Sequence, residues 1–115
     1  MTDTGAWSFT VDEDGMVLVT APPGVPEGVR LAVETVLIPL GDSAVAVESY
    51  LREWRRLAES GEDYALATTS AQVSRVGPEV ELGDMYGQFE DCRMSAEEFE
   101  RMLRQLVDFL GSRRS

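Results

Sequence analysis

The chain of 115 residues is 43% hydrophobic and contains five prolines, which predicts one folded domain, residues 1–115, with its own hydrophobic core. Its formal net charge of −11 argues against direct binding to nucleic-acid phosphates or to anionic membrane surfaces. The charge serves either solubility alone or attraction to a basic protein partner, and composition leaves both interpretations open.

The residue types narrow the chemistry further. All ten basic residues are arginine, and histidine, the commonest general base and metal ligand, is absent. Cys92 is the single cysteine, so neither an internal disulfide nor a cysteine-based zinc site is expected. We therefore expect no enzyme activity, no cofactor and no metal. Residues 1–5 lack the features of a signal peptide, and no apolar run reaches the ~20 residues of a membrane span, so we expect a cytoplasmic protein.

The first predicted elements form a β-hairpin. Residues 7–11 alternate apolar and polar side chains, as in a half-buried strand, and residues 16–21 resume an extended run. Between them, residues 12–15 read Asp-Glu-Asp-Gly, which suits a turn or the start of a calcium loop. Because the ligand spacing and the closing glutamate of a calcium loop are missing, we predict a turn.

Residues 29–38 fit two periodicities. Every second residue from Val29 to Leu37 is apolar or threonine, as in a strand, whereas Val29, Val33 and Leu37 also recur at helical spacing. The segment is rich in β-branched residues, and Pro39 ends it. We therefore predict a central strand that is covered on both sides near its end.

A helix is predicted next. Asp42 or Ser43 caps its start, and it runs to about Ser60 with Gly61 as the stop signal. The residues of its apolar stripe, which we expect to face the core, are Val47, Tyr50, Leu51, Trp54, Leu57 and Ala58.

Shorter extended segments follow this helix. Residues 64–69 are predicted to be extended, and residues 71–76 and 79–82 are predicted to pair as a hairpin about a Gly-Pro turn. Residues 83–88 have the composition of a loop, and residues 89–94 are predicted to contain a last short strand.

The final helix has the strongest signals in the chain. Ser95 and Glu98 have the spacing of a capping box, and Met94 and Phe99 have the spacing of a hydrophobic staple. Gly111 is predicted to end the helix. The apolar stripe consists of Phe99, Met102, Leu103, Leu106, Val107 and Leu110. Taken together, the elements predict an α+β fold: a mainly antiparallel β-sheet with two amphipathic helices packed on one face.

No residue pattern identifies a catalytic centre. Acidic pairs could supply acid–base chemistry, but no spacing supports this, and solvated surface charge explains them equally well. These pairs are Glu62/Asp63, Glu90/Asp91 and Glu79/Glu81. A nucleophilic role for Cys92 would need a neighbouring base, which a chain without histidine does not readily provide, so we expect a packed small residue.

The loop over residues 84–91 is the best candidate for a binding site. It combines acidic groups with two aromatic residues, a methionine and a glycine, which suits a protein interface with Tyr86 as the buried anchor. The alternative is an ordinary loop whose Phe89 packs into the core. The predicted partner-binding residues are Asp84, Tyr86, Glu90 and Asp91 of the loop, with neighbouring Glu79, Glu81, Glu62 and Asp63.

Several segments resemble a known family. A strand ending in Val-Glu-Leu at residues 80–82, an acid-and-tyrosine loop at 84–86, and Met-Ser-Ala-Glu-Glu-Phe at 94–99 opening a leucine-rich helix are similar to small bacterial immunity proteins of polymorphic-toxin and contact-dependent-inhibition systems. The helix from Ser43 fits the same pattern, and the resemblance covers about residues 28–110. It implies a non-enzymatic inhibitor that binds a cognate toxin, often a basic nuclease, and blocks its active site.

We therefore predict an acidic protein-binding module, with an immunity protein as the leading hypothesis. One alternative is a small structural or regulatory subunit, acting as a homodimer through an exposed sheet edge or within a larger complex. Another is an enzyme that uses a carboxylate pair, which the absence of histidine and lysine disfavours.

Overall fold

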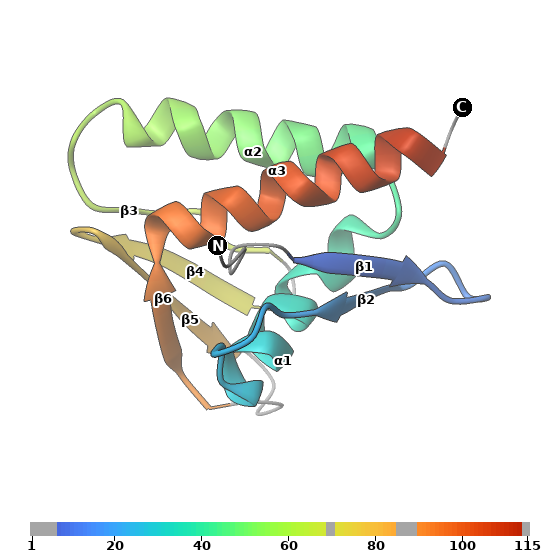
Figure 1. The fold of residues 1–115 in the computed structure, drawn as a ribbon. Coiled ribbons are helices and arrows are strands. Elements are labelled where there is room, and N and C mark those ends of the chain that lie inside the picture. The colour runs from blue at the N-terminus through green and yellow to red at the C-terminus, as the bar shows by residue number, and fades with distance from the viewer. Residues whose placement is uncertain (1–6, 69–70, 85–89, 114–115) are drawn as a thin grey trace, which may run out of the picture.

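The computed structural model describes residues 7–68, 71–84 and 90–113 and has an α+β fold (Figure 1). Within these residues, three α-helices and one short 3-10 helix accompany six strands in two antiparallel sheets. The predicted fold class is confirmed. The elements in chain order are β1 (Ser8–Val11), β2 (Val17–Thr20), α1 (Glu27–Leu37), η1 (Ile38–Leu40), α2 (Ala44–Ala58), β3 (Tyr64–Ala65), β4 (Ala71–Val76), β5 (Glu79–Asp84), β6 (Cys92–Ser95) and α3 (Ala96–Arg113).

The N-terminal hairpin forms as predicted, but as a separate two-stranded sheet. β1 and β2 pair antiparallel, and the carboxylate of Asp12 accepts hydrogen bonds from the backbone N–H groups of Asp14 and Met16, each at 2.9 Å. Gly15 adopts a φ of +82°, which a residue with a side chain rarely adopts. Asp12 therefore caps a turn, as the sequence indicated.

The prediction of a strand at residues 29–38 is wrong, because α1 occupies most of this segment. Pro26 precedes the first helical turn in an extended conformation, where its missing N–H is not needed. The β-branched residues cost a helix only about 0.5 kcal/mol each, which burial of one apolar face outweighs. The buried residues of that face lie at helical spacing and are Val29, Ala32, Val33, Val36 and Leu37.

The outer edge of β2 is covered by side chains from α1. Glu34 accepts a hydrogen bond from the backbone N–H of Val19 at 3.0 Å, and Arg30 donates to the Val19 carbonyl at 3.1 Å. Arg30 and Glu34 also pair with each other at 3.1 Å. An ion pair thus satisfies backbone groups that an edge strand would otherwise offer to another chain.

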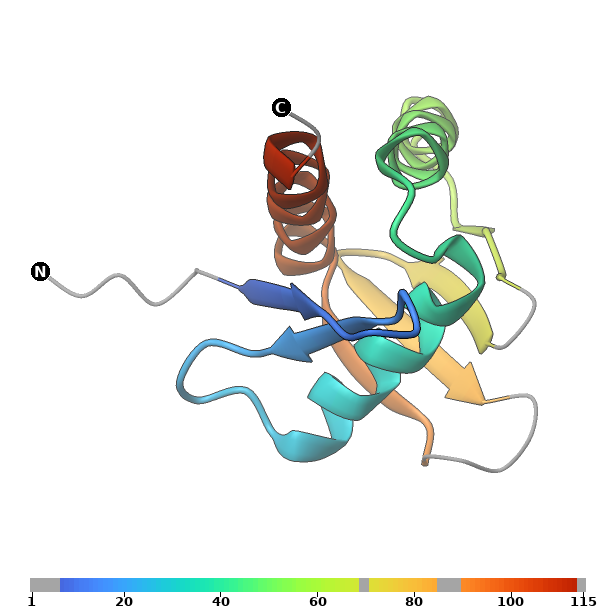
Figure 2. The ribbon, with the colours of Figure 1, turned by 90° about the vertical axis from the view of Figure 1, so that its right-hand side faces the viewer.

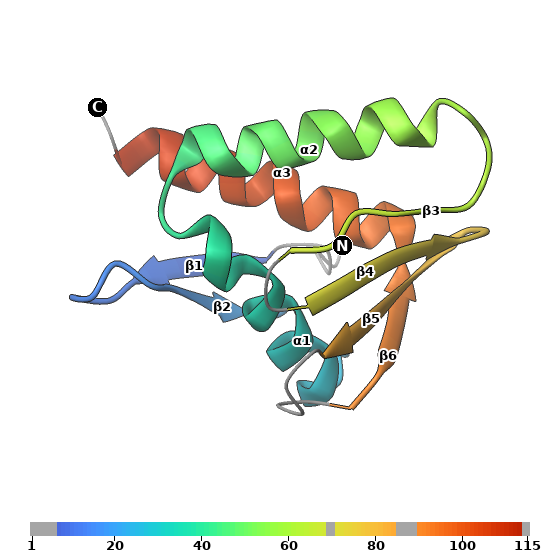
Figure 3. The same ribbon diagram turned by 180° about the vertical axis from the view of Figure 1, so that it is seen from behind.

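Helix α2 begins at the predicted cap. The hydroxyl of Ser43 accepts a hydrogen bond from the backbone N–H of Ala46 at 3.1 Å, and Gly61 has a φ of +77° just beyond the helix. α2 lies beside α3 and runs in the opposite direction (Figure 1). From its end the chain returns through β3 to the edge of the second sheet (Figure 3).

The second sheet has the strand order β3-β4-β5-β6, and all its pairings are antiparallel. The predicted hairpin of β4 and β5 is confirmed, and the chain beyond β3 remains paired with β4 through Leu66 and Thr68. α1 and α3 pack on one face of this sheet (Figure 2). The buried residues of that face are Ala71, Val73, Val80, Leu82 and Met94.

Helix α3 joins the two sheets. Ser95 accepts the predicted hydrogen bond from the backbone N–H of Glu98 at 2.9 Å. The carboxylate of Glu98 accepts from the indole N–H of Trp7 at 2.6 Å and from Arg101 at 2.8 Å, and so ties β1 to the start of the helix. The helix runs through Gly111 to Arg113, two residues past the predicted end. No helix in the described part of the chain is long and apolar enough to cross a membrane.

Replacement of Leu106 by alanine should destabilise the protein by about 2–5 kcal/mol, because this fully buried side chain would leave a cavity. Asp108→Ala on the exposed side of the same helix is the control and should change stability by less than about 0.5 kcal/mol. Urea denaturation measures both. Unfolding of Leu106→Ala at the parent's midpoint would mean that the α3 stripe does not form the core.

Candidate protein-binding surface

One face of the four-stranded sheet has no helix over it in the described part of the chain (Figures 1 and 2). Residues directly opposite one another on paired strands share a face, and Ser74, Glu81 and Arg93 form one such row across β4, β5 and β6. We call this surface the open sheet face. Its strand residues are Gln72, Ser74, Val76, Glu79, Glu81, Gly83, Arg93 and Ser95, and Asp91, directly before β6, adjoins it.

Arg93 is the basic residue of the open sheet face. Its guanidinium lies 3.4 Å from the Glu79 carboxylate and 3.3 Å from that of Glu81, and hydrogen bonds to these two groups raise the pKa of Arg93. All three side chains are about half exposed, so solvent weakens both ion pairs. Arg93 pairs with the two carboxylates while leaving them accessible to solvent.

A shallow depression of about 220 Å³ lies at the end of this face where β5 ends and β6 begins. Glu81, Asp84 and Asp91 contribute carboxylates to it. Gly83 also lines it, and a Cβ at this position would be in van der Waals contact, at 3.4 Å, with a carboxylate oxygen of Asp91. Within the described residues, no three His, Cys, Asp or Glu side chains are grouped so that they could hold a metal ion.

The predicted binding residues divide between the two ends of the sheet. Asp84, Glu90 and Asp91 lie where β5 ends and β6 begins, and Glu79 starts β5 about 17 Å away, the length of a six-residue strand. Glu81 lies between these ends and joins them across the open sheet face. Tyr86 and Phe89, the two aromatic residues of the predicted loop, lie outside the described residues.

Glu62 and Asp63 lie near the Glu79 end, and one of them has a structural contact. The carboxylate of Asp63 accepts a hydrogen bond from the backbone N–H of Gly77 at 3.0 Å, in the turn between β4 and β5. The side chain of Glu62 is exposed. Asp63 therefore links the chain just before β3 to the turn between β4 and β5 by a hydrogen bond.

Cys92 is half-buried at the start of β6, opposite Leu82. Burial raises the pKa of its thiol, and the nearby Asp91 carboxylate raises it further. A raised pKa lowers the fraction of reactive thiolate at neutral pH. This environment favours the predicted packing role over a nucleophilic one.

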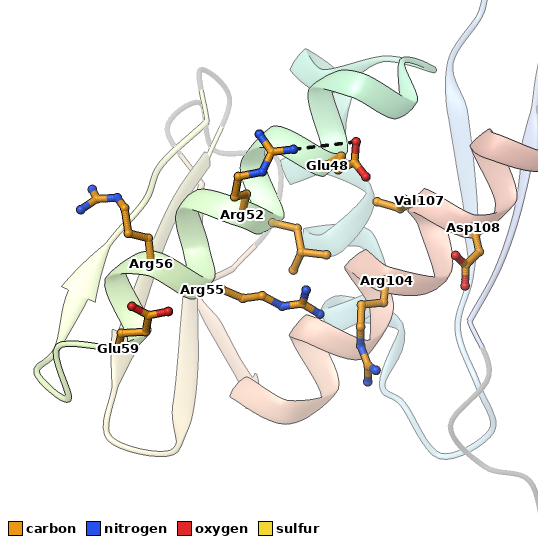
Figure 4. Close-up of a pocket in the computed structure, with 9 residues that line it drawn as sticks. Glu48, Arg52, Arg55, Arg56, Glu59, Arg104, Val107 and Asp108 are labelled. Atoms are coloured by element: carbon orange, nitrogen blue, oxygen red, sulfur yellow. Dashed lines mark ion pairs between the residues drawn. The ribbon is translucent and has the colours of Figure 1, made fainter.

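A second charged surface was not anticipated from the sequence. Arg52, Arg55 and Arg56 of α2 and Arg104 of α3 line one groove (Figure 4). The signal in the sequence was the spacing of the three α2 arginines, which places them on the exposed side of an amphipathic helix.

Comparison of the chain with protein-family models, with curated proteins and with solved structures gave no match.

Replacement of Asp63 by alanine should destabilise the protein by about 1 kcal/mol, because the Gly77 N–H loses its carboxylate acceptor. Glu62→Ala removes the same charge from the adjacent exposed position and should change stability by less than about 0.5 kcal/mol. Thermal denaturation of both variants tests the difference. Equal melting temperatures would show that Asp63 does not support the turn.

Alkylation of Cys92 by iodoacetamide should be slower at pH 8 in the folded protein than in the urea-unfolded chain, because the raised pKa leaves less thiolate. The midpoint of the rate–pH profile should lie higher in the folded protein, and Asp91→Asn should lower it by removing a charge that disfavours the thiolate. A folded-state midpoint at or below the unfolded one would contradict this assignment.

Proposed function

We propose that this chain is a non-enzymatic protein-binding module whose open sheet face, with adjoining Asp84 and Glu90, binds a basic protein. The particular role that we propose is that of an immunity protein, which neutralises a basic cognate toxin in the bacterial cytoplasm.

The observation that carries the proposal is an accessible row of carboxylates on a rigid sheet. Glu79 and Glu81 lie on β5, whose opposite face is buried in the core, and Asp91 directly precedes β6, so the backbone positions of the two glutamates are set before a partner arrives. A preorganised surface loses less conformational entropy on binding than a flexible one.

Electrostatics favours a basic partner. The net charge of −11 attracts a positively charged protein from a distance and speeds its association. At short range, Glu79 and Glu81 each have a second carboxylate oxygen with which to accept from a lysine or arginine of the partner, beside the contact to Arg93. Arg93 itself would repel a misaligned cation and so help to set the register of the complex.

The immunity role rests on the resemblance of residues 28–110 and on this charge. A nuclease toxin binds an anionic substrate and therefore has a basic surface around its active site. A stiff acidic sheet could cover such a surface and exclude the substrate without performing chemistry. The proposal keeps Tyr86 as the aromatic anchor of the interface and Glu62 as a charge at its margin.

Charge reversal of two residues between β5 and β6 tests the proposal. The double variant Glu90→Arg, Asp91→Arg should slow association with the captured partner about tenfold at low salt and weaken its salt dependence. The control Glu13→Arg, Asp14→Arg makes the same change in net charge on the separate N-terminal hairpin, where both side chains are also exposed. It should slow association much less.

The partner is obtained by affinity capture from cells of the source, and its binding is measured by surface plasmon resonance at low and high salt. Circular dichroism verifies that both variants remain folded. Capture of an acidic partner would contradict the proposal. So would an effect of the hairpin control as large as that of the sheet variant.

A further inference from the structure

The arginine-lined groove lies between α2 and α3, away from the open sheet face, and encloses about 570 Å³ (Figure 4). Four of the ten arginines of this acidic chain line it, against three carboxylates. The complete lining is Glu48, Leu51, Arg52, Arg55, Arg56, Glu59, Arg104, Val107 and Asp108. The lining thus carries one more positive than negative charge, and two of its arginines, Arg55 and Arg56, pair with Glu100 and Glu53 outside it.

The four guanidinium groups differ in how far they are already paired, and that of Arg56 is held by two hydrogen bonds to the Glu53 carboxylate. Within the described part of the chain, Arg104 has neither an ion pair nor a hydrogen bond for its guanidinium. Arg52 lies 3.9 Å from Glu48 with both side chains largely exposed, which is a weak contact. Arg55 pairs with Glu100 at 3.2 Å and keeps further N–H donors free for a second acceptor.

Two arginines approach the groove from opposite walls. Arg55 extends from α2 toward α3, and Arg104 projects downward from α3 in this view, and both side chains line the groove (Figure 4). Leu51 and Val107 supply apolar surface between them. Planar guanidinium groups on facing walls suit bidentate hydrogen bonds to phosphate or carboxylate oxygens.

We propose that this groove binds a compact anion that carries two or more phosphate or carboxylate groups. Arg55 and Arg104 bind its oxygens from the two walls, and Arg52 adds a third positive charge. Glu48 of α2 and Glu59, the residue that caps the C-terminus of this helix, lie at either end of the arginine row, about 16 Å apart along the helix axis. Together with Asp108 they repel an extended polyanion, so the groove selects short anions over nucleic acid.

The anion site shares no residue with the open sheet face. Its ligand also has the opposite charge from the basic protein proposed for that face. Each proposal can therefore fail without affecting the other.

The test is a titration of the ¹⁵N-labelled protein with inorganic triphosphate and with citrate at low salt, followed by NMR. The arginine Nε–H signals of Arg55 and Arg104 and the backbone signals of α2 and α3 should shift and saturate. Arg55→Gln and Arg104→Gln should each weaken binding about tenfold, the effect of losing one charge-assisted hydrogen bond. Stronger binding of triphosphate would identify the ligand as a phosphate, and stronger binding of citrate would identify it as a carboxylate.

Arg113→Gln is the matched control, because it removes the same charge from the end of α3 outside the groove. It should leave affinity nearly unchanged, and the dispersion of the NMR spectrum confirms that each variant is folded. The proposal is overturned if neither anion gives saturable shifts, or if Arg113→Gln weakens binding as much as Arg104→Gln. Tighter binding of a single-stranded oligonucleotide than of triphosphate at equal phosphate concentration would also overturn it.

Discussion

Burial of one face of α3 is the interaction on which the other elements depend. Phe99, Leu103, Leu106 and Leu110 are almost completely removed from solvent, and the helix contacts α2, β1, β5 and β6. Each such side chain contributes about 1.5–3 kcal/mol of hydrophobic free energy before chain entropy is counted. Without α3, the residues of β1, β5 and β6 that it covers would be exposed, and α2 would lose the helix against which it packs.

Polar contacts from the same helix position the N-terminal hairpin. Trp7 donates its backbone N–H to the Gln105 side chain at 2.7 Å and its indole N–H to Glu98. The rings of Phe9 and Phe109 lie 5.9 Å apart, so the hairpin also has an apolar contact with the helix. The hairpin thus forms its own sheet and completes the core from the side, without adding strands to the second sheet.

The two charged surfaces have different origins in the fold. The open sheet face is polar because every second residue of β4, β5 and β6 points away from the helices. The groove is rich in arginine because arginines on two antiparallel helices meet along the line where the helices pack. Its lining has four arginines against three carboxylates, whereas Glu79 and Glu81 on the sheet face share the single Arg93.

Local signals in the sequence were sufficient for most elements. The hairpins, the cap of α2 at Ser43 and the cap of α3 at Ser95 each depend on neighbouring residues, and hydrogen bonds in the structure confirm them. The acidic character of the candidate site could also be predicted, since strand alternation places Glu79 and Glu81 on the same side.

Other features depend on residues that are distant in the sequence. Residues 29–38 satisfied both a strand and a helix pattern, and only packing of one face against β2 and the second sheet selected α1. The Glu98 carboxylate does not accept from the Ser95 backbone N–H, as a capping box requires. It accepts from the indole N–H of Trp7, which is 91 residues away and which local spacing cannot reveal. The groove also required tertiary structure, since Arg104 joins the arginines of α2 only when the two helices lie side by side. The sequence by itself determined the local turns, caps and amphipathic faces. Tertiary packing decided which of these faces meet, because the favoured pairing of faces depends on apolar burial summed over the whole chain.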